Sequence, residues 1–452
     1  MESRLTKKEI TLFTISAILT IDGIAAAAAI GVQSLTWWVL SFLCFAIPYA
    51  LVSSDLGTKF PSKGGIVHWV KLALGDNWAA RTSWLYWINV ALWMPAAFIM
   101  LAGFAAQLFW PEMPLYVQII IALVATWISV FICIVSPDAG KWVPMIGAWC
   151  KMLVVLLLGI GGVMMAFESG IANEINIATL TPSWDEGLQF FPVIIFSLMG
   201  FDLICCSGDE MENPKRDLPL SLMLAGLIIT ILYLFAVLGI LVAIPVEEIG
   251  LVTGLLETFH RMLAPFPMGD KLLYLVGFMA MFSFIANLVT WGMGANRAAS
   301  EAAKEHELPA IFGINHKKYD TPLGASVLAG VVSSIAILLY GTMANSAEAL
   351  YWSLFSFANL IFLLPYLALF PTYLILNKTN NVSAKKRFLY VFPPMLFLIQ
   401  AIVFFIFPPG EFNSFDLTVT LCGLTIVFGI GEWIVYTNNH RNNKSNLSKS
   451  EV

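Results

Sequence analysis

The fold is decided by residues 191–219, FPVIIFSLMGFDLICCSGDEMENPKRDLP, where an aspartate, Asp202, lies inside an apolar run. A charged side chain at membrane depth is rare and usually functional. Gly200, two residues earlier, permits the chain to leave helical geometry and frees backbone groups for a ligand. Broken helices of this kind form the binding sites of many transporters. The alternative is that Asp202 is a structural carboxylate and that Gly200 only lets two helices approach closely.

The composition around this stretch is that of a polytopic membrane protein. Of the 452 residues, 59% are hydrophobic and 12% are charged, and the mean hydropathy is +0.82. Apolar runs of about 20 residues, long enough to cross a bilayer core of about 30 Å, recur along the chain. We therefore expect an all-α integral membrane protein with twelve transmembrane helices. The predicted spans are residues 10–31, 35–56, 80–108, 115–135, 142–166, 188–208, 218–244, 272–296, 322–342, 348–376, 388–408 and 416–437.

The distribution of basic residues predicts the orientation of these spans. Connections on one side are rich in Lys and Arg, and such a side is normally cytoplasmic. The basic residues on this side are Lys59, Lys63, Lys71, Lys141, Lys215, Arg216, Lys304, Lys317, Lys318, Lys378, Lys385, Lys386, Arg387, Arg441, Lys444 and Lys449. The opposite side carries Arg261 and Lys271. We expect a multi-pass protein of the cell membrane with both termini in the cytoplasm.

The cysteines and the net charge add little to the prediction of function. The six cysteines lie in apolar runs without the spacing of metal ligands or of a secreted disulfide framework, so we interpret them as packing residues and expect neither a metal site nor a disulfide. They are Cys44, Cys133, Cys150, Cys205, Cys206 and Cys422. The net charge of −5 gives no sign of nucleic-acid binding.

The first span, like the sixth, places an acid and a glycine inside the membrane. It contains TIDGIAAAAAIG, residues 20–31, with Asp22 and Gly23 before an alanine run. Two broken helices five spans apart predict an inverted repeat. The alanines themselves are compatible with an unwound segment or with a smooth helical face on which backbones pack closely.

Aromatic residues in the third and eighth spans are candidates for binding a cation. Tyr86 and Trp93 lie within the third span, although tryptophans near a span end more often form an interfacial belt. Trp291 is followed by Gly292 and Gly294, which leave room for its ring to lie across a substrate. Filling the core is the equally common alternative for such a ring.

Lys151 lies about nine residues into the fifth span, roughly 13 Å deep at the helical rise. Snorkelling from that depth is difficult. A buried lysine either titrates or pairs with an acid or with carbonyl groups across a helix interface. We favour the second role, a fixed ammonium standing where a sodium ion would otherwise bind.

Three segments together carry a family resemblance that extends over nearly the whole chain. They are MGFDLICCSGDEMENPKRDLP (residues 199–219), DLGTKFPSKGGIVHWV (55–70) and WGMGANRAASEAAKEHELPAIF (291–312). They resemble the amino acid–polyamine–organocation superfamily, and within it the bacterial amino acid/amine antiporters of the arginine/agmatine and agmatine/putrescine type. The combination is specific to the superfamily but not to a substrate.

The resemblance implies a five-plus-five inverted-repeat core of the LeuT type with two accessory helices, working by alternating access. On this division, residues 1–9 form a cytoplasmic leader and 10–376 the transport core, with halves 10–166 and 188–376. Residues 388–437 form the accessory helices and 438–452 a polar tail, which we expect to be disordered.

The resemblance also implies roles for single residues. Asp202 falls at a proton-sensing position, Phe196 at a substrate-facing one and Trp291 at that of a stacking tryptophan. The substrate-binding residues expected in all are Phe196, Met199, Gly200, Asp202, Asp22, Ala27, Ala28, Tyr86, Met94 and Trp291. Lys151 resembles the fifth-span lysine of sodium-independent relatives and is assigned, with Asp202, to proton or cation coupling. We expect Asp202 to be the main partner of the substrate amine and the source of any pH dependence.

One departure bears on the substrate. The family's first-span break reads like GSG, whose amides hold the substrate carboxylate, whereas Ala26, Ala27 and Ala28 are expected to occupy it here. Alanine keeps the N–H groups but resists the unusual dihedral angles. Weakened carboxylate recognition and two intramembrane acids, Asp22 and Asp202, favour cationic amines over glutamate/GABA exchange.

We therefore predict a secondary active transporter, without cofactor or metal, that exchanges cationic amines or amino acids as an agmatine/putrescine-type or amino acid/amine antiporter. The alternatives kept open are a proton-coupled amino acid permease, a glutamate/GABA-type antiporter and a non-transporting membrane sensor. No nucleophile–base pair or phosphate loop predicts an enzyme, and no pore ring predicts a channel. The expected partners are small cationic amines or amino acids and the lipid bilayer, with a homodimer left as an option.

Overall fold

The computed structural model describes residues 6–62, 64–135, 139–205, 211, 213–378, 383–410 and 414–450. These residues form helices and turns, and no β-strand occurs among them. The predicted all-α class is therefore confirmed for the described chain. Lys63, Cys206, residues 1–5 of the leader and residues 451–452 of the tail lie outside the described residues.

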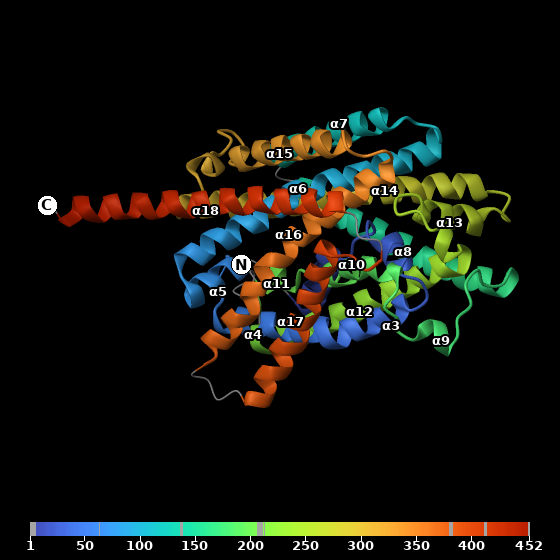
Figure 1. Cartoon of the computed structure of the whole chain (residues 1–452), viewed down its shortest axis with the longest axis horizontal. Helices are drawn as coiled ribbons and strands as arrows, with labels where there is room; N and C mark the ends of the chain where they lie inside the picture. Colours follow the sequence, from blue (N-terminus) through green and yellow to red (C-terminus); the bar gives the residue numbers. More distant parts are fainter. Residues whose placement is uncertain are drawn as a thin grey trace.

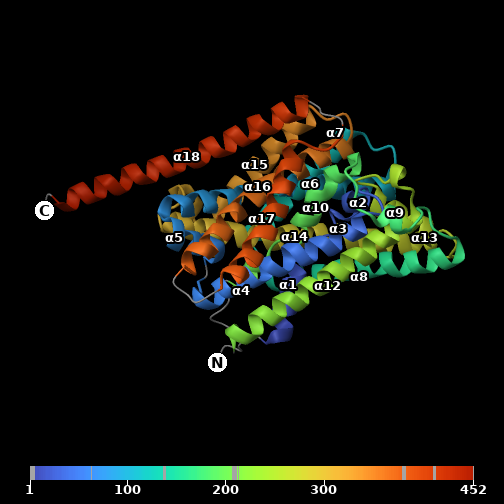
Figure 2. The same ribbon diagram turned by 60° about the horizontal axis from the view of Figure 1, so that its bottom comes forward.

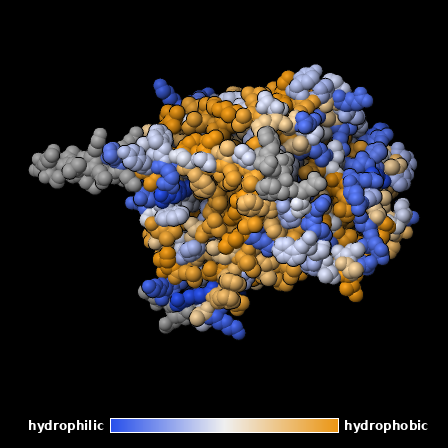
Figure 3. Space-filling view, viewed as in Figure 1, coloured by the Kyte–Doolittle hydropathy of each residue, from blue (hydrophilic) through white to orange (hydrophobic). Residues whose placement is uncertain are grey.

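Eleven segments of the described chain are long and apolar enough to cross a membrane. A chain as apolar as this must satisfy its backbone groups internally in lipid, which helices achieve. An apolar belt accordingly separates two polar ends of the molecule (Figure 3). The segments are Ser34–Lys59 (α3, Ser34–Ser41, and α4, Ile47–Lys59, joined by a π-helical turn), α6 (Asp76–Phe109), α7 (Leu115–Val135), α8 (Ala139–Glu168), Glu186–Cys205 (with α10, Phe191–Phe196, and α11, Phe201–Cys205), α12 (Pro214–Ala243), α14 (Gly269–Lys304), α15 (Leu323–Gly341), α16 (Ala347–Leu376), α17 (Ala384–Ile406) and α18 (Ser414–Ser450).

The first predicted span is two short helices rather than one continuous helix. α1 (Lys7–Ile18) and α2 (Ile24–Ala28) are separated by residues 19–23, which are not helical. The expectation that the break falls on Ala26, Ala27 and Ala28 was wrong. Alanine has the highest helix propensity, whereas an Asp-Gly pair competes with helical hydrogen bonding, so the chain unwinds before the alanine run.

Helix α6 lies at the centre of the bundle. Its most apolar window is 94% buried, and the helix packs against α7, α14, α15 and α16. A helix that is apolar all round belongs in such an interior position. α8 packs in turn against α12 and α14, so α14 connects α6 to the pair formed by α8 and α12 (Figure 2).

One end of the bundle, here called the basic end, carries Lys59, Lys71 and Lys304. The short helix α5 (Gly65–Leu74) lies there against α6 (Figure 1). An ion pair of 3.3 Å joins Lys7 at the start of α1 to Asp217 in the first turn of α12. The Asn438 amide in α18 donates to the Glu307 carbonyl, which follows α14, at 2.9 Å. The two ends of the described chain therefore lie at this same end.

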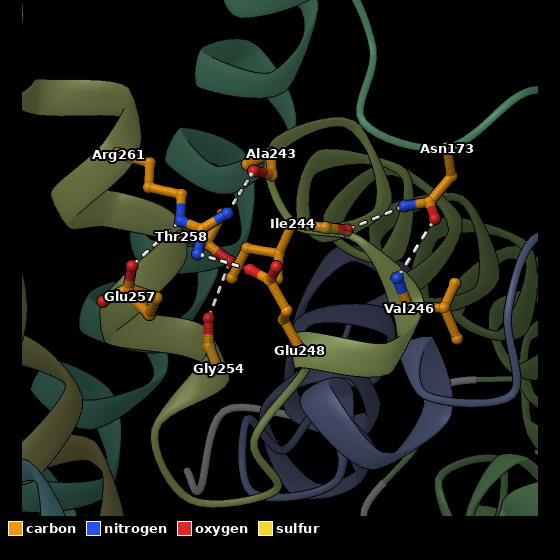
Figure 4. Close-up of polar contacts among 9 residues, drawn as sticks. All are labelled: Asn173, Ala243, Ile244, Val246, Glu248, Gly254, Glu257, Thr258 and Arg261. Atoms are coloured by element: carbon orange, nitrogen blue, oxygen red, sulfur yellow. Dashed lines mark hydrogen bonds and ion pairs between the residues drawn. The ribbon is translucent and has the colours of Figure 1, made fainter.

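The opposite end is closed by connecting segments. Besides α9 (Ile177–Leu180), they include α13 (Gly254–Leu263), which contacts α14 and α2. Arg261 of α13 donates to Glu257 at 2.9 Å and to Glu248 at 3.0 Å (Figure 4). The Asn173 side chain bonds the backbone at the end of α12 and just after it, at Leu241, Ile244 and Val246. α13 is thus held against α2, the helix that follows the first break.

The C-terminal segment corrects one further expectation. α18 remains helical through Ser450, where the sequence predicted a disordered tail from residue 438. Each residue added to an existing helix gains one hydrogen bond without a new nucleation step, so a membrane helix can propagate into a polar sequence.

Candidate functional site

The sixth predicted span breaks where Gly200 was expected to permit it. α10 ends at Phe196 and α11 begins at Phe201, with residues 197–200 between them. Gly200 has φ = +111°, a conformation that residues with a Cβ avoid. A Cβ atom there would also lie 3.2 Å from Ile18 at the end of α1. The two helix breaks therefore approach each other, with Gly200 at the contact.

Buried tyrosines satisfy the backbone at both breaks. The Tyr233 hydroxyl on α12 accepts from the Thr20 N–H at 2.8 Å and donates to the Thr20 carbonyl at 3.1 Å. The Tyr49 hydroxyl on α4 accepts from the Gly200 N–H at 3.2 Å. Tyr351 donates to the Asp22 carbonyl at 2.5 Å. These bonds stabilise unwound backbone that would otherwise lack partners in the membrane.

Asp202 lies in the first turn of α11 and is held by two phenols. Its Oδ1 accepts from Tyr49 at 2.5 Å and from Tyr366 of α16 at 3.1 Å. The side chain is buried. These bonds tie α11 to α4 and α16, and Asp202 does not border the central cavity described below.

Asp22, in the first break, makes a different set of contacts. Its Oδ2 accepts from the indole N–H of Trp93 on α6 at 2.8 Å. Its Oδ1 is buried and makes no hydrogen bond of standard geometry with the described residues, although the Thr20 hydroxyl lies close to the carboxylate. A buried carboxylate oxygen without a donor is costly and suits a cationic ligand.

A central cavity lies between the two breaks. It is lined by Ala17, Ile18, Thr20, Asn89, Trp93, Phe196, Met199, Trp291 and Phe362, which come from α1, α6, α10, α14, α16 and both breaks. Its volume is ≈ 20 Å³, room for about one water molecule. The walls must therefore separate before a substrate can enter.

Aromatic rings form most of the cavity wall. Trp291 meets Trp93 edge to face, with ring centroids 6.2 Å apart, and Phe362 at 5.9 Å. Phe196 meets Phe362 at 5.6 Å. The Trp291 N–H donates to the Ala17 carbonyl at 3.3 Å, which leaves the ring face to border the cavity. Rings in this arrangement can bind an ammonium or guanidinium group through their π faces.

Four further predicted site residues, Tyr86, Met94, Ala27 and Ala28, do not line this cavity. Tyr86 lies two helical turns from Trp93 and borders a larger cavity instead, while Met94 is buried against Gly292. Ala27 lies in α2, and its N–H donates to the Gly23 carbonyl at 2.9 Å. Ala28 is also helical and buried. The amides of these two alanines are thus engaged in helix α2 and do not face the cavity.

Lys151 on α8 binds the end of α1. Its ammonium donates to the Ser16 carbonyl at 2.5 Å and to the Asn287 side-chain oxygen on α14 at 3.3 Å. The last carbonyls of a helix lack intrahelical donors, and a cation near them is favourable. This geometry agrees with the structural-cation role expected for Lys151.

A second cavity, of ≈ 640 Å³, opens at the basic end between α5, α6 and α14. Lys71 on its wall pairs with Glu307 at 2.8 Å and with Glu305 at 3.2 Å. The hydrogen bond to Glu307 raises the pKa of Lys71 above its usual range. Tyr86 borders this cavity one helical turn from Asn89 of the central cavity, so the two cavities are neighbours along α6.

Several residues of the site were not identified from the sequence. Tyr49, Tyr233 and Tyr366 lie in apolar runs where a tyrosine carries no distinguishing pattern. Asn89 had a usable signal, because it is an amide inside the third span, three residues after Tyr86 and four before Trp93.

Eleven apolar segments of the described chain and two facing helix breaks define a multi-pass membrane protein with a central cavity. The amino acid permease family model matches residues 5–430, and the chain belongs to that family. It is 33% identical over 449 residues to the probable agmatine/putrescine antiporter of Lactococcus lactis, covering 95% of each chain.

Two more distant relatives agree with this assignment. The chain is 24% identical to a glutamate/gamma-aminobutyrate antiporter of Lactococcus lactis, covering 90% of this chain and 85% of the relative. It is also 24% identical to an uncharacterised transporter of Legionella pneumophila, covering 80% of this chain and 78% of the relative. The family recognised in the sequence is thereby confirmed.

Proposed function

We propose that this protein is a secondary active antiporter that exchanges small cationic amines, of the agmatine/putrescine kind, by alternating access. The observation that carries the proposal is the buried Asp22 carboxylate, which is bonded to Trp93 of the aromatic-lined cavity and whose Oδ1 makes no hydrogen bond of standard geometry within the described chain. A carboxylate and π faces together favour an ammonium or guanidinium group. The relationship to the probable agmatine/putrescine antiporter supports the same substrate class.

The roles of the two acids differ in this proposal. The sequence favoured Asp202 as the main partner of the substrate amine. Asp202 is already bonded by Tyr49 and Tyr366 and lies off the central cavity, whereas Asp22 is linked to the cavity wall through Trp93. Asp22 therefore binds the substrate ammonium, and Asp202 responds to protons and to the geometry of the second break.

Substrate contacts follow from the cavity wall. Trp291 covers the substrate, and Phe196, Met199 and the backbone before Gly200 complete the wall. Tyr86 acts from the neighbouring larger cavity, and Met94 supports the site from its position against Gly292. Ala27 and Ala28 serve as a close-packed helical surface rather than as amide donors.

The proposed architecture is a twelve-span protein in which α1 and α2 together cross the membrane as the first span. The paired breaks support a five-plus-five repeat, because Tyr49 of the second span serves the sixth and Tyr233 of the seventh serves the first. The basic end is the cytoplasmic one. The large cavity there is then the inner vestibule, and α13 closes the outer path.

The proposal is tested by exchange in proteoliposomes. Purified protein is reconstituted into liposomes loaded with unlabelled putrescine, and uptake of labelled agmatine or putrescine is measured, with unloaded liposomes as the control. We expect uptake that depends on internal amine. Exchange of glutamate for γ-aminobutyrate without amine exchange would instead assign the glutamate/GABA activity. No exchange of any amine or amino acid would favour a non-transporting sensor.

A further inference from the structure

The side-chain amide of Asn89 is a buried polar group that the roles above leave unused. Asn89 lies on α6, is 3% exposed and borders the central cavity. Its Oδ1 is buried without a hydrogen-bond partner among the described residues. A buried amide in that position is unfavourable unless a ligand or water completes its hydrogen bonds.

Asn89 and Asp22 lie near the same ring. Asn89 and Trp93 are four residues apart on α6 and therefore share one face of the helix, about 6 Å apart along its axis. The Trp93 indole extends from that face to Asp22. Asp22 thus lies behind Trp93 of the cavity wall, with no standard hydrogen bond to its Oδ1 from the described residues, and the Asn89 amide borders the cavity one helical turn away, toward the basic end.

The chemistry of the two groups is complementary to a ligand with nitrogen at both ends. Asp22 balances one positive charge. An amide oxygen accepts N–H donors from a second ammonium or a guanidinium, and it adds no further charge that would have to be desolvated in the cavity. An apolar residue at the Asn89 position would leave the second polar end of such a ligand unpaired.

We propose that Asn89 is a specificity-determining residue that binds the distal nitrogen group of the substrate, so that the site selects diamines and agmatine over monoamines of the same length. This inference rests on the proposed function, because it assumes that the cavity binds cationic amines. It adds the basis on which two-ended amines are distinguished from one-ended ones.

The test uses full-length Asn89→Leu protein in proteoliposomes. Competition of unlabelled putrescine, agmatine and n-butylamine against labelled putrescine gives the apparent affinity for each. Removing a hydrogen bond to a charged group should weaken putrescine and agmatine about tenfold or more, while n-butylamine changes less than about twofold. Asn89→Asp keeps an acceptor oxygen and should retain the preference for two-ended amines.

Gln107→Leu is the matched control, since it removes an amide from the same helix, 18 residues toward the opposite end, where Gln107 bonds the Thr253 carbonyl. This variant should keep the wild-type preference. Equal loss for all three amines in Asn89→Leu, or an unchanged preference, would overturn the role of Asn89 while leaving amine exchange by the wild type intact. Wild-type protein that exchanges no amine would overturn the proposed function and this inference with it.

Discussion

At the scale of single residues, the site distributes its charged groups among different tasks. Lys151 is bound to the end of α1, and Asp202 is held by Tyr49 and Tyr366. One oxygen of Asp22, by contrast, makes no standard hydrogen bond with the part of the chain that the structure describes. Buried charges that are fully hydrogen-bonded by protein groups stabilise the arrangement of the helices. A buried charge with an incomplete set of hydrogen bonds is available to bind a ligand. This difference separates substrate binding from coupling.

The two aspartates give the first prediction. Asp22→Asn should weaken putrescine and agmatine more than about a hundredfold, because an amide cannot balance a charge in a buried pair. Asp202→Asn should keep most of this affinity but flatten the pH dependence of exchange, since the amide has no proton to gain in this range. Exchange of putrescine, agmatine and a zwitterionic amino acid is measured from acidic to neutral pH. Selective loss of amines in Asp202→Asn, with Asp22→Asn unaffected, would reverse the two roles.

Trp291 gives the second prediction. A cation–π contact contributes about 0.5–2 kcal/mol, depending on desolvation, so Trp291→Leu should weaken amine binding about tenfold. The control is Trp127→Leu, which removes an exposed tryptophan on α7 whose N–H donates to Ser334 at 3.1 Å. Apparent affinity from competition in proteoliposomes is the measurement. Equal affinities in the two variants would make Trp291 a core-filling residue.

At the scale of elements, the two broken helices depend on each other. The break after α10 requires Gly200 in a conformation with φ = +111°, and its nearest side chain belongs to α1. The break after α1 is held by Tyr233 of α12. Movement of either break therefore changes contacts with the other, as alternating access requires.

Gly200→Ala tests this element. The added Cβ meets a disfavoured dihedral angle and the Ile18 side chain at 3.2 Å, so stability should fall by about 1–3 kcal/mol. Exchange should slow as well, because the second break is displaced. Gly294→Ala is the control, since Gly294 is helical and has open space where its Cβ would be. Thermal unfolding in detergent is measured for both, and equal stabilities would show that the break tolerates a side chain.

At the scale of the whole molecule, we propose that Lys151 makes the bundle independent of an added cation. Its ammonium connects α8 to the carbonyl end of α1 and to Asn287 of α14, so three helices meet at one fixed positive charge. A sodium ion at the same place would be repelled.

Exchange should therefore need no sodium. Replacing sodium by choline on both sides of the proteoliposome membrane should leave the rate of amine exchange unchanged. Lys151→Ala should lower both the exchange rate and the thermal stability, because buried carbonyl groups lose their donor. A collapse of wild-type exchange in choline would contradict the structural-cation role of Lys151.

The sequence alone determined the class of protein, most of the membrane spans and the family, because the hydropathy of a segment and the position of a glycine are local properties of the chain. The helix break at Gly200 was also predictable from the sequence, since it follows from the dihedral freedom of one residue. The position of the first break was misjudged because it depends on the competition between an Asp-Gly pair and a strong alanine helix, which the resemblance did not reveal.

Only the tertiary structure decided which acid lies near the cavity and which is bonded by phenols. The cavity wall is assembled from α1, α6, α10, α14 and α16, whose residues lie up to hundreds of positions apart in the chain. Their meeting depends on how helices pack side by side, and no local pattern records that packing. Asn89, Tyr49 and Tyr233 acquire their roles only through these distant partners.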